Sequence, residues 1–165
     1  MQRELLASAG LPCGVCGKGH FQQTDVQGRA FSYRDEPAIV LTFSFLVPAC
    51  DVCGELRESQ AHAESLDALL EVEYTAKRIA ATREMVALLV GNGWRQVEIE
   101  QVMALSTGYL SKAIRGEKTL ATSTLRHLIH LALHPRQSLR DLAPLFPQVR
   151  DIELALENRG VFAGA

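Results

Sequence analysis

Residues 96–118 read QVEIEQVMALSTGYLSKAIRGEK, and this stretch decides the fold of the C-terminal half of the chain. Apolar residues recur at the spacing of one helix face before and after a short interruption: Ile99, Val102 and Met103, then Leu110, Ala113 and Ile114. Ser106, in the interruption, is a residue type that favours a helix N-cap. The stretch predicts two short helices packed across a tight turn, a helix-turn-helix. An ordinary pair of packed helices is the alternative.

Polar and basic residues occupy the outer face of the second predicted helix, which we expect to begin near Thr107 and which could enter a DNA major groove. Ser106 is expected to cap that helix, and four residues are expected to face bases: Thr107, Tyr109, Ser111 and Lys112. Three more are expected to contact phosphates: Gln96, Arg115 and Lys118.

The same stretch resembles, without a gap, the helix-turn-helix of the Cro and phage-repressor type. The matching positions are Gln96, Ser106, Leu110, Ser111, Lys112 and Gly116. Glu100 stands where that family usually has a small residue, and Arg95 stands where it often has a capping Thr. A degenerate helix-turn-helix that only dimerises is a further alternative.

Charge is distributed unevenly along the 165 residues, although the formal net charge is only −2. Residues 1–75 carry 5 basic and 11 acidic side chains, residues 76–140 carry 10 and 4, and residues 141–165 carry 2 and 4. The basic middle contains the predicted helix-turn-helix, which is the distribution that phosphate contact requires. An apolar content of 47% is enough for a packed core.

Four cysteines occur in two near-copies, PCGVCG at residues 12–17 and ACDVCG at residues 49–54. In a reducing compartment such pairs are better interpreted as metal ligands than as disulfides. The pairs predict one structural zinc ion per chain, held by Cys13, Cys16, Cys50 and Cys53 with no open coordination position. A redox CxxC is the alternative, and His20 and His62 are either substitute ligands or surface residues.

Between the cysteine pairs, residues 21–33 and 38–47 predict two strands with a turn at 35–37. Ile39, Leu41, Phe43 and Phe45 alternate along the second strand. So small a sheet needs the metal for stability, about 10–16 kcal/mol in peptide models. The predicted fold class is α+β: a small zinc-bound antiparallel β module followed by an all-α helix-turn-helix domain.

Four segments are expected along the chain: a zinc module over 1–58 that begins with a tail or frayed helix over 1–10, an acidic linker helix over 59–75, the helix-turn-helix domain over 76–135, and a helical extension over 136–165. A separate helix is expected from 76 to 90, stopped by Gly91-Asn92-Gly93, with Trp94 as an apolar plug. Thr122 or Ser123 is expected to cap a further helix that ends at Pro135.

Two features are open to more than one interpretation. His127, His130 and His134 lie on one helix at spacings that permit a metal site or a pH switch, although no further ligand is evident nearby. Two apolar stripes follow Pro135, and they either cover the core or join two subunits.

No secretory segment follows Met1, and the longest uncharged run, residues 37–50, is too short to cross a bilayer, so a cytoplasmic protein without a membrane partner is expected. No serine–histidine–aspartate order, phosphate loop or paired-carboxylate pattern indicates an enzyme.

The combined order of parts over residues 11–135 closely resembles the MqsA-type antitoxins of bacterial toxin–antitoxin systems. The paired CxxC motifs, the Tyr33-Arg34 segment and the helix from Ser111 to Gly116 carry this likeness. The resemblance implies that the zinc module binds a ribonuclease toxin. It also implies a homodimer that binds an inverted-repeat operator in double-stranded DNA and represses its own operon.

In that family an Asn and an Arg read the DNA, and the matching positions here are Gly108 and Lys112. Lysine lacks the bidentate fork of arginine, so the operator sequence should differ from the family's usual one. A stand-alone zinc-ribbon regulator without a toxin, and an enzyme that uses the cysteines for redox work, are the other hypotheses.

Overall fold

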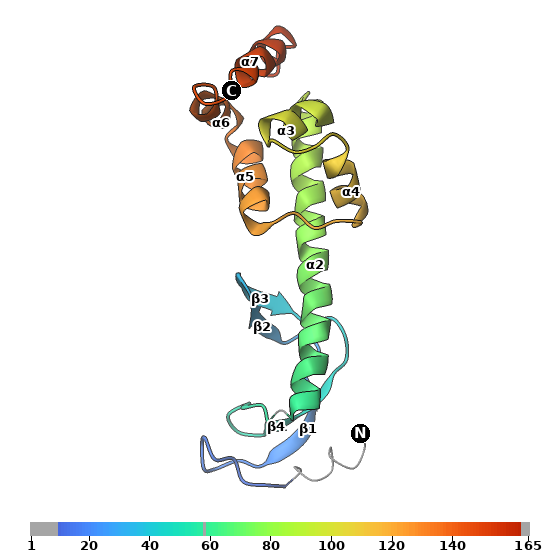
Figure 1. The fold of residues 1–165 in the computed structure, drawn as a ribbon. Coiled ribbons are helices and arrows are strands. Elements are labelled where there is room, and N and C mark those ends of the chain that lie inside the picture. Colours follow the sequence, from blue (N-terminus) through green and yellow to red (C-terminus); the bar gives the residue numbers. More distant parts are fainter. Residues whose placement is uncertain (1–9, 58, 163–165) are drawn as a thin grey trace. The chain divides into compact units, whose positions relative to one another are not determined.

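The structure is a computed structural model that describes residues 10–57 and 59–162. The chain divides into two compact units between Tyr74 and Thr75, and each is described by itself. The first holds two small antiparallel sheets and a cluster of four cysteines, and the second is helical, so the fold is α+β as the sequence predicts (Figure 1). The tail expected over residues 1–10 lies, apart from Gly10, outside the described residues.

Unit 1 contains four short strands: β1 (Phe21–Asp25), β2 (Ala30–Tyr33), β3 (Glu36–Val40) and β4 (Leu46–Cys50). β1 pairs with β4 so that Phe21 lies opposite Cys50, and β2 pairs with β3 so that Phe31 lies opposite Ile39. Because β1 follows the first cysteine pair and β4 leads into the second, this antiparallel pairing brings the two pairs to the same end of the sheet.

The prediction of two long strands, over residues 21–33 and 38–47, is wrong in extent, because each range is interrupted by a loop. Residues 41–45 form a loop because carboxylates from elsewhere hold its backbone: the Thr42 N–H donates to Glu73 Oε1 at 2.8 Å and the Phe45 N–H donates to Asp25 Oδ1 at 3.0 Å. Phe43 is therefore 45% exposed instead of lying on a buried strand face. The turn between β2 and β3 lies at residues 34–35, one position before the expected one.

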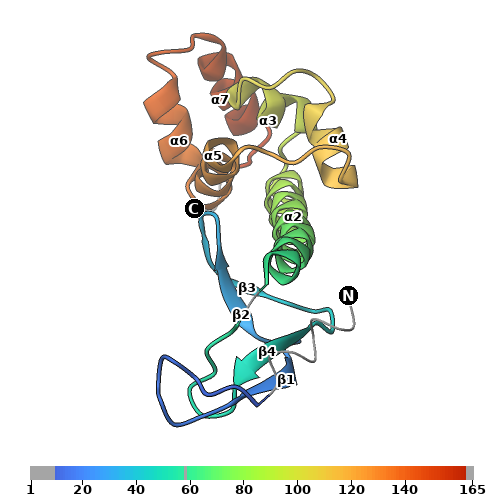
Figure 2. The ribbon, with the colours of Figure 1, turned by 60° about the horizontal axis from the view of Figure 1, so that its bottom comes forward.

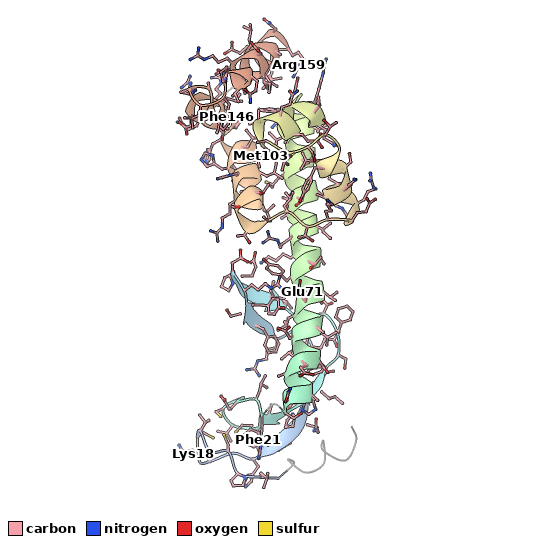
Figure 3. The ribbon with its side chains drawn as sticks, in the orientation of Figure 1. Lys18, Phe21, Glu71, Met103, Phe146 and Arg159 are labelled. Atoms are coloured by element: carbon pink, nitrogen blue, oxygen red, sulfur yellow. The ribbon has the colours of Figure 1, made fainter. Side chains whose placement is uncertain are left out.

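The core of unit 1 joins the β part to the first half of a long helix, α2 (Gln60–Gly91). Its buried members are Val26, Ile39, Leu41, Val47, Leu66, Leu70 and Tyr74. Arg34, in the β2–β3 turn, pairs at 2.8 Å with Glu71, which is labelled on α2 in Figure 3. The Arg34 guanidinium lies over the rings of Tyr33 and Tyr74. The Tyr33-Arg34 segment thus fastens the hairpin to α2.

α2 is one helix of 32 residues, where the sequence predicts two with a change near residue 75. The expectation rested on the switch from acidic to basic side chains, but a change of charge does not break a helix. Residues 60–90 contain neither glycine nor proline and are rich in alanine and leucine, so nothing stops propagation before the expected Gly91-Asn92-Gly93 stop. Gly93 there has a φ of 89°.

Unit 2 contains the second half of α2 and five further helices: α3 (Gln96–Val102), α4 (Tyr109–Arg115), α5 (Thr122–Leu133), α6 (Pro135–Leu142) and α7 (Gln148–Asn158). α4 and α5 flank this half of α2 (Figure 1, Figure 2). Trp94 is 2% exposed within the shared core, which confirms it as an apolar plug and makes the only tryptophan of the chain a reporter of unit 2.

The C-terminal extension completes the core of unit 2. Its buried side chains are Leu139, Val149, Ile152, Leu156 and Phe162, all in the cluster that includes α3, α4 and α5. Arg136 donates to the Phe162 carbonyl and lies 5.1 Å from its ring centroid. The interpretation in which the apolar stripes cover the core is therefore confirmed.

None of the helices in the described ranges has the length and apolar character needed to cross a bilayer.

Candidate functional site

The four cysteine sulfurs form a compact cluster, with all ligand atoms within 4.8 Å of one another. Cys13 Sγ lies 3.7 Å from Cys53 Sγ, and Cys16 Sγ lies 3.7 Å from Cys50 Sγ. A tetrahedral zinc ion with Zn–S bonds of about 2.3 Å places its sulfurs about 3.8 Å apart. The observed spacing fits that ion and is far longer than a disulfide bond of about 2.05 Å. Four cysteines that could hold a metal ion are thus confirmed, and zinc stays a prediction.

Charge within the cluster also favours a bound cation. Backbone N–H groups of Lys18 and Gly19 lower the pKa of the Cys16 thiol to about 6. The backbone at Glu55 acts in the same direction on Cys53, but burial and the neighbouring thiols outweigh it and raise the pKa of Cys53 to about 12. Four thiolates so close together repel one another, and a divalent cation removes that penalty.

Two tight turns aim the sulfurs at one point. The Gly17 N–H donates to the Cys13 carbonyl at 2.9 Å, and the Gly54 N–H donates to the Cys50 carbonyl at 3.0 Å. Gly17 and Gly54 have φ values of 65° and 71°, which confirms that the glycine after each second cysteine adopts the left-handed conformation.

Two supporting residues of the cluster were missed by the sequence analysis. Asp51 accepts the His20 N–H at 2.8 Å and the Gln22 side-chain amide at 3.0 Å, so it fastens the second turn to the start of β1. Gly19 lies against that turn, and a Cβ built on it would be 2.5 Å from both Cys50 Sγ and Asp51 Oδ1. No sequence signal marks Gly19, because it lies outside the CxxCG pattern.

The two histidines considered as substitute ligands are not in the cluster found among the described residues. His20 contributes its backbone N–H to Asp51, and the ring of His62 contacts Ser59 Oγ at 3.2 Å at the start of α2. Cysteine is therefore the ligand type at this centre.

In unit 2, α3 and α4 pack together with the predicted apolar faces inward. Ile99 and Leu110 are fully buried, and Val102 and Ala113 are nearly so. The second helix, however, begins at Tyr109, two residues later than expected, with Gly108 as its N-cap at a φ of 78°. The prediction that Ser106 caps it is wrong because a carboxylate from α3 takes that role.

Glu100 supplies this cap from a position that is only 3% exposed. Its Oε2 accepts the Gly108 N–H at 3.0 Å, and its Oε1 accepts the Leu110 N–H at 2.9 Å and the Gln96 amide at 3.2 Å. The negative charge at a helix N-terminus adds a favourable dipole interaction. The unexpected glutamate in this family-like motif therefore fixes the position of α4 on α3.

Arg95, the second departure from the family pattern, is compensated in a similar way. Glu98 reaches back from the third position of α3 to accept the Arg95 N–H at 2.8 Å, which caps α3 without a threonine. The same Glu98 oxygen receives the Arg159 guanidinium at 2.6 Å. The C-terminal segment thus neutralises a buried carboxylate at the start of the motif.

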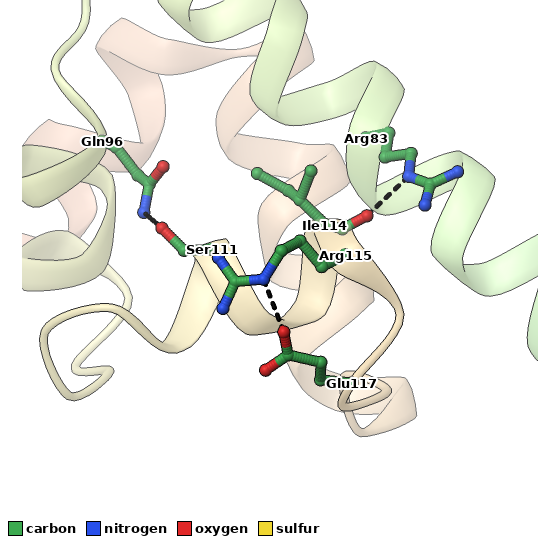
Figure 4. Close-up of polar contacts among 6 residues, drawn as sticks. All are labelled: Arg83, Gln96, Ser111, Ile114, Arg115 and Glu117. Atoms are coloured by element: carbon green, nitrogen blue, oxygen red, sulfur yellow. Dashed lines mark hydrogen bonds and ion pairs between the residues drawn. The ribbon is translucent and has the colours of Figure 1, made fainter.

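The residues expected to contact DNA lie on α4, in the segments next to it or, for Gln96, at the start of α3, and several have partners within the chain (Figure 4). Gln96 donates to Ser111 Oγ at 2.7 Å, so both help to join α3 to α4. Arg115 pairs with Glu117 at 2.5 Å. Lys118 Nζ lies 5.4 Å from the centroid of the Tyr109 ring. The remaining candidates, Ser106, Thr107 and Lys112, are exposed. DNA contact by these residues stays a prediction.

The hydrogen bond between Arg115 and Glu117 favours the charged form of both side chains. The hydrogen bond from Arg115 lowers the pKa of the Glu117 carboxyl, and the same bond raises the pKa of Arg115. Both side chains are about half exposed, so the pair itself contributes little to stability.

Among the described residues, His127, His130 and His134 do not belong to any group of side chains that could hold a metal ion. His130 Nδ1 instead contacts Ser138 Oγ at 2.9 Å, and the rings of His130 and His134 are 5.2 Å apart.

The turn after α3 contains an unfavourable backbone conformation, since Ala104 has a φ of 52° and is exposed. We expect Ala104→Gly to stabilise unit 2 by about 0.5–1 kcal/mol, because the left-handed strain of alanine exceeds the extra freedom of glycine in the unfolded chain. Ala87→Gly, the same change on the exposed face of α2, should instead destabilise by about 1 kcal/mol. Urea unfolding followed by Trp94 fluorescence measures both, and equal signs would contradict the strain at Ala104.

No protein-family model matches the chain, and a comparison with curated proteins finds no match. The resemblance to MqsA-type antitoxins therefore rests on the motifs quoted above.

Proposed function

We propose that this protein is a DNA-binding transcriptional repressor whose N-terminal module is stabilised by one structural zinc ion. The observation that supports it best is the α3–α4 pair, in which buried Glu100 holds the N-terminus of α4 while Lys112 and Arg115 remain exposed. A helix held in this way can present its outer face to a major groove. The excess of basic residues over 76–140 provides the phosphate attraction.

We further propose that the protein is an antitoxin, in which the module over 1–58 binds a ribonuclease toxin. The acidic excess of residues 1–75 would complement a basic, RNA-binding enzyme. A stand-alone regulator without a toxin is the competing proposal. Co-expression with the small open reading frames adjacent to the gene decides between them. Co-purification of a ribonuclease supports the antitoxin, and the absence of any such frame supports the stand-alone regulator.

Base contacts and phosphate contacts should separate in DNA titrations at physiological salt. Lys112→Ala should cost roughly 1–3 kcal/mol on the preferred operator and little on unrelated duplex, because it removes a base contact. Arg115→Ala should weaken both duplexes alike and reduce the salt slope by about one. If the wild-type protein does not prefer its own upstream region to unrelated DNA, the repressor proposal is wrong.

A substitution of Glu117, the ion-pair partner of Arg115, provides a control that should change DNA affinity in the opposite direction. Glu117→Gln removes the carboxylate that holds Arg115 and a negative charge that would lie near phosphates. It should strengthen binding to any duplex, with a steeper salt dependence, and leave the preference for the operator unchanged.

Because one short helix reads few base pairs, an inverted repeat bound by a homodimer is the expected operator.

A further inference from the structure

A groove of about 430 Å³ lies in unit 2, bordered by the end of α3, by α5 and by α6 with the residues that follow it. Its apolar wall consists of Val102, Met103, Leu131, Leu142 and Phe146. Met103 and Phe146, which line it from different segments, are labelled in Figure 3. The volume is within the range of small-molecule sites, about 300–1,000 Å³.

The polar side chains that line the groove are those of His127, His130, Ser138 and Asp141. Ser138 Oγ donates to the His134 carbonyl at 2.9 Å and also lies 2.9 Å from His130 Nδ1. In the neutral tautomer whose Nδ1–H donates to Ser138 Oγ, Nε2 of His130 is an acceptor. Asp141, on the α6 side, accepts the Gln137 amide through Oδ1 at 2.7 Å, and no bond to a described residue involves Oδ2.

The charge of the groove is opposite to that of its surroundings. Asp141 is the one carboxylate among its lining residues in the described part of the chain, and neither lysine nor arginine lines it. Residues 76–140 as a whole carry 10 basic and 4 acidic side chains. An apolar groove with a carboxylate and a second acceptor complements a molecule that has an apolar body and a positive, hydrogen-donating end.

We propose that this groove binds a small organic cation, an amine with an aromatic or branched alkyl body. The ammonium group donates to Asp141 Oδ2 and His130 Nε2, and the apolar body lies against Met103 and Phe146, where sulfur–aromatic contact is favourable. This binding activity is separate from DNA recognition, and its test requires no DNA.

The test uses phenethylamine as the probe and its carboxylate counterpart of similar shape, 3-phenylpropionate, as the matched control. The chain has three methionines, of which Met103 lines the groove and Met85 packs in the helical core. With 13C-methyl-methionine labelling of the full chain, phenethylamine should shift the Met103 signal saturably and leave the Met85 signal in place. The Met103→Leu variant assigns the signal.

We expect 3-phenylpropionate to require at least about tenfold higher concentration for the same Met103 shift, and Asp141→Asn to weaken phenethylamine by about tenfold. Asp151→Asn, which removes an exposed charge outside this groove, should leave the affinity unchanged. The proposal is overturned if no saturable shift occurs, if both probes act alike, if Met85 shifts equally, or if Asp141→Asn binds as the wild type does.

Discussion

Gly19→Ala is expected to lower the affinity of the cysteine cluster for zinc by at least about 100-fold, although it changes no ligand. A Cβ at this position would lie 2.5 Å from Cys50 Sγ and from Asp51 Oδ1, and 3.0 Å from Val52 Cβ. Neither neighbour can yield easily, because Cys50 is the last residue of β4 and Asp51 is bound to the His20 N–H. The second turn must therefore move, and its two sulfurs leave the tetrahedral arrangement.

Gly14→Ala is the matched control, since it is the same substitution in the first cysteine turn and a Cβ there meets nothing within 4 Å. Competition with a chelating dye measures the affinity, and elemental analysis gives the stoichiometry. Cys16→Ser provides the reference for a lost ligand. The signal of Trp94 should report a folded unit 2 in all three variants. Wild-type zinc affinity in Gly19→Ala, or equal losses in both alanine variants, would contradict the packing at Gly19.

The second large effect is expected for Glu100→Ala, which should destabilise unit 2 by about 3 kcal/mol. The change leaves the N–H groups of Gly108 and Leu110 without their acceptor in a buried place, and hydrogen bonds to a charged group contribute about 1.5–3 kcal/mol each. Glu100→Gln should be intermediate, because its amide retains a single acceptor oxygen. Urea unfolding followed by Trp94 fluorescence at saturating zinc measures the change.

Glu84→Ala serves as the control for Glu100→Ala. Glu84 is exposed on α2 and makes no hydrogen bond or ion pair with the described residues, so its loss should change stability by less than about 0.5 kcal/mol. If Glu100→Ala is as stable as Glu84→Ala, Glu100 does not cap α4. Under the proposed function, Glu100→Ala should also weaken operator binding, since α4 would lose its fixed position.

The inward faces of α3 and α4 could be predicted because residues such as Ile99 and Leu110 follow the helical period, which depends only on local spacing. The cysteine cluster could be predicted for a related reason, since each CxxC pair forms its turn locally and the two pairs are near-copies. The role of Glu100 could not, because its partners Gly108 and Leu110 reach it only after the chain has turned back. The sequence alone shows a charged residue in place of a small one.

The loop at residues 41–45 illustrates the same limit. Alternating apolar residues favour a strand there, but Asp25 and Glu73, distant in sequence, bind its backbone and end the ladder. At residue 75 the opposite occurred: a visible change in charge suggested a boundary between helices, but no glycine or proline interrupts residues 60–90 and α2 continues through this point. Contacts between distant residues overrode local pattern in the first case, and local propensity outweighed charge in the second.

The dependence of the α3–α4 pair on Leu156, Arg159 and Phe162 also bears on how the protein is made. A nascent chain that has just released α4 from the ribosome already contains all four cysteines, which together could hold a metal ion. The core around Ile99 at that moment lacks the side chains that close it, and Glu98 lacks its arginine. The α3–α4 pair is therefore completed last, and its apolar faces stay accessible to chaperones and proteases until translation has passed Phe162.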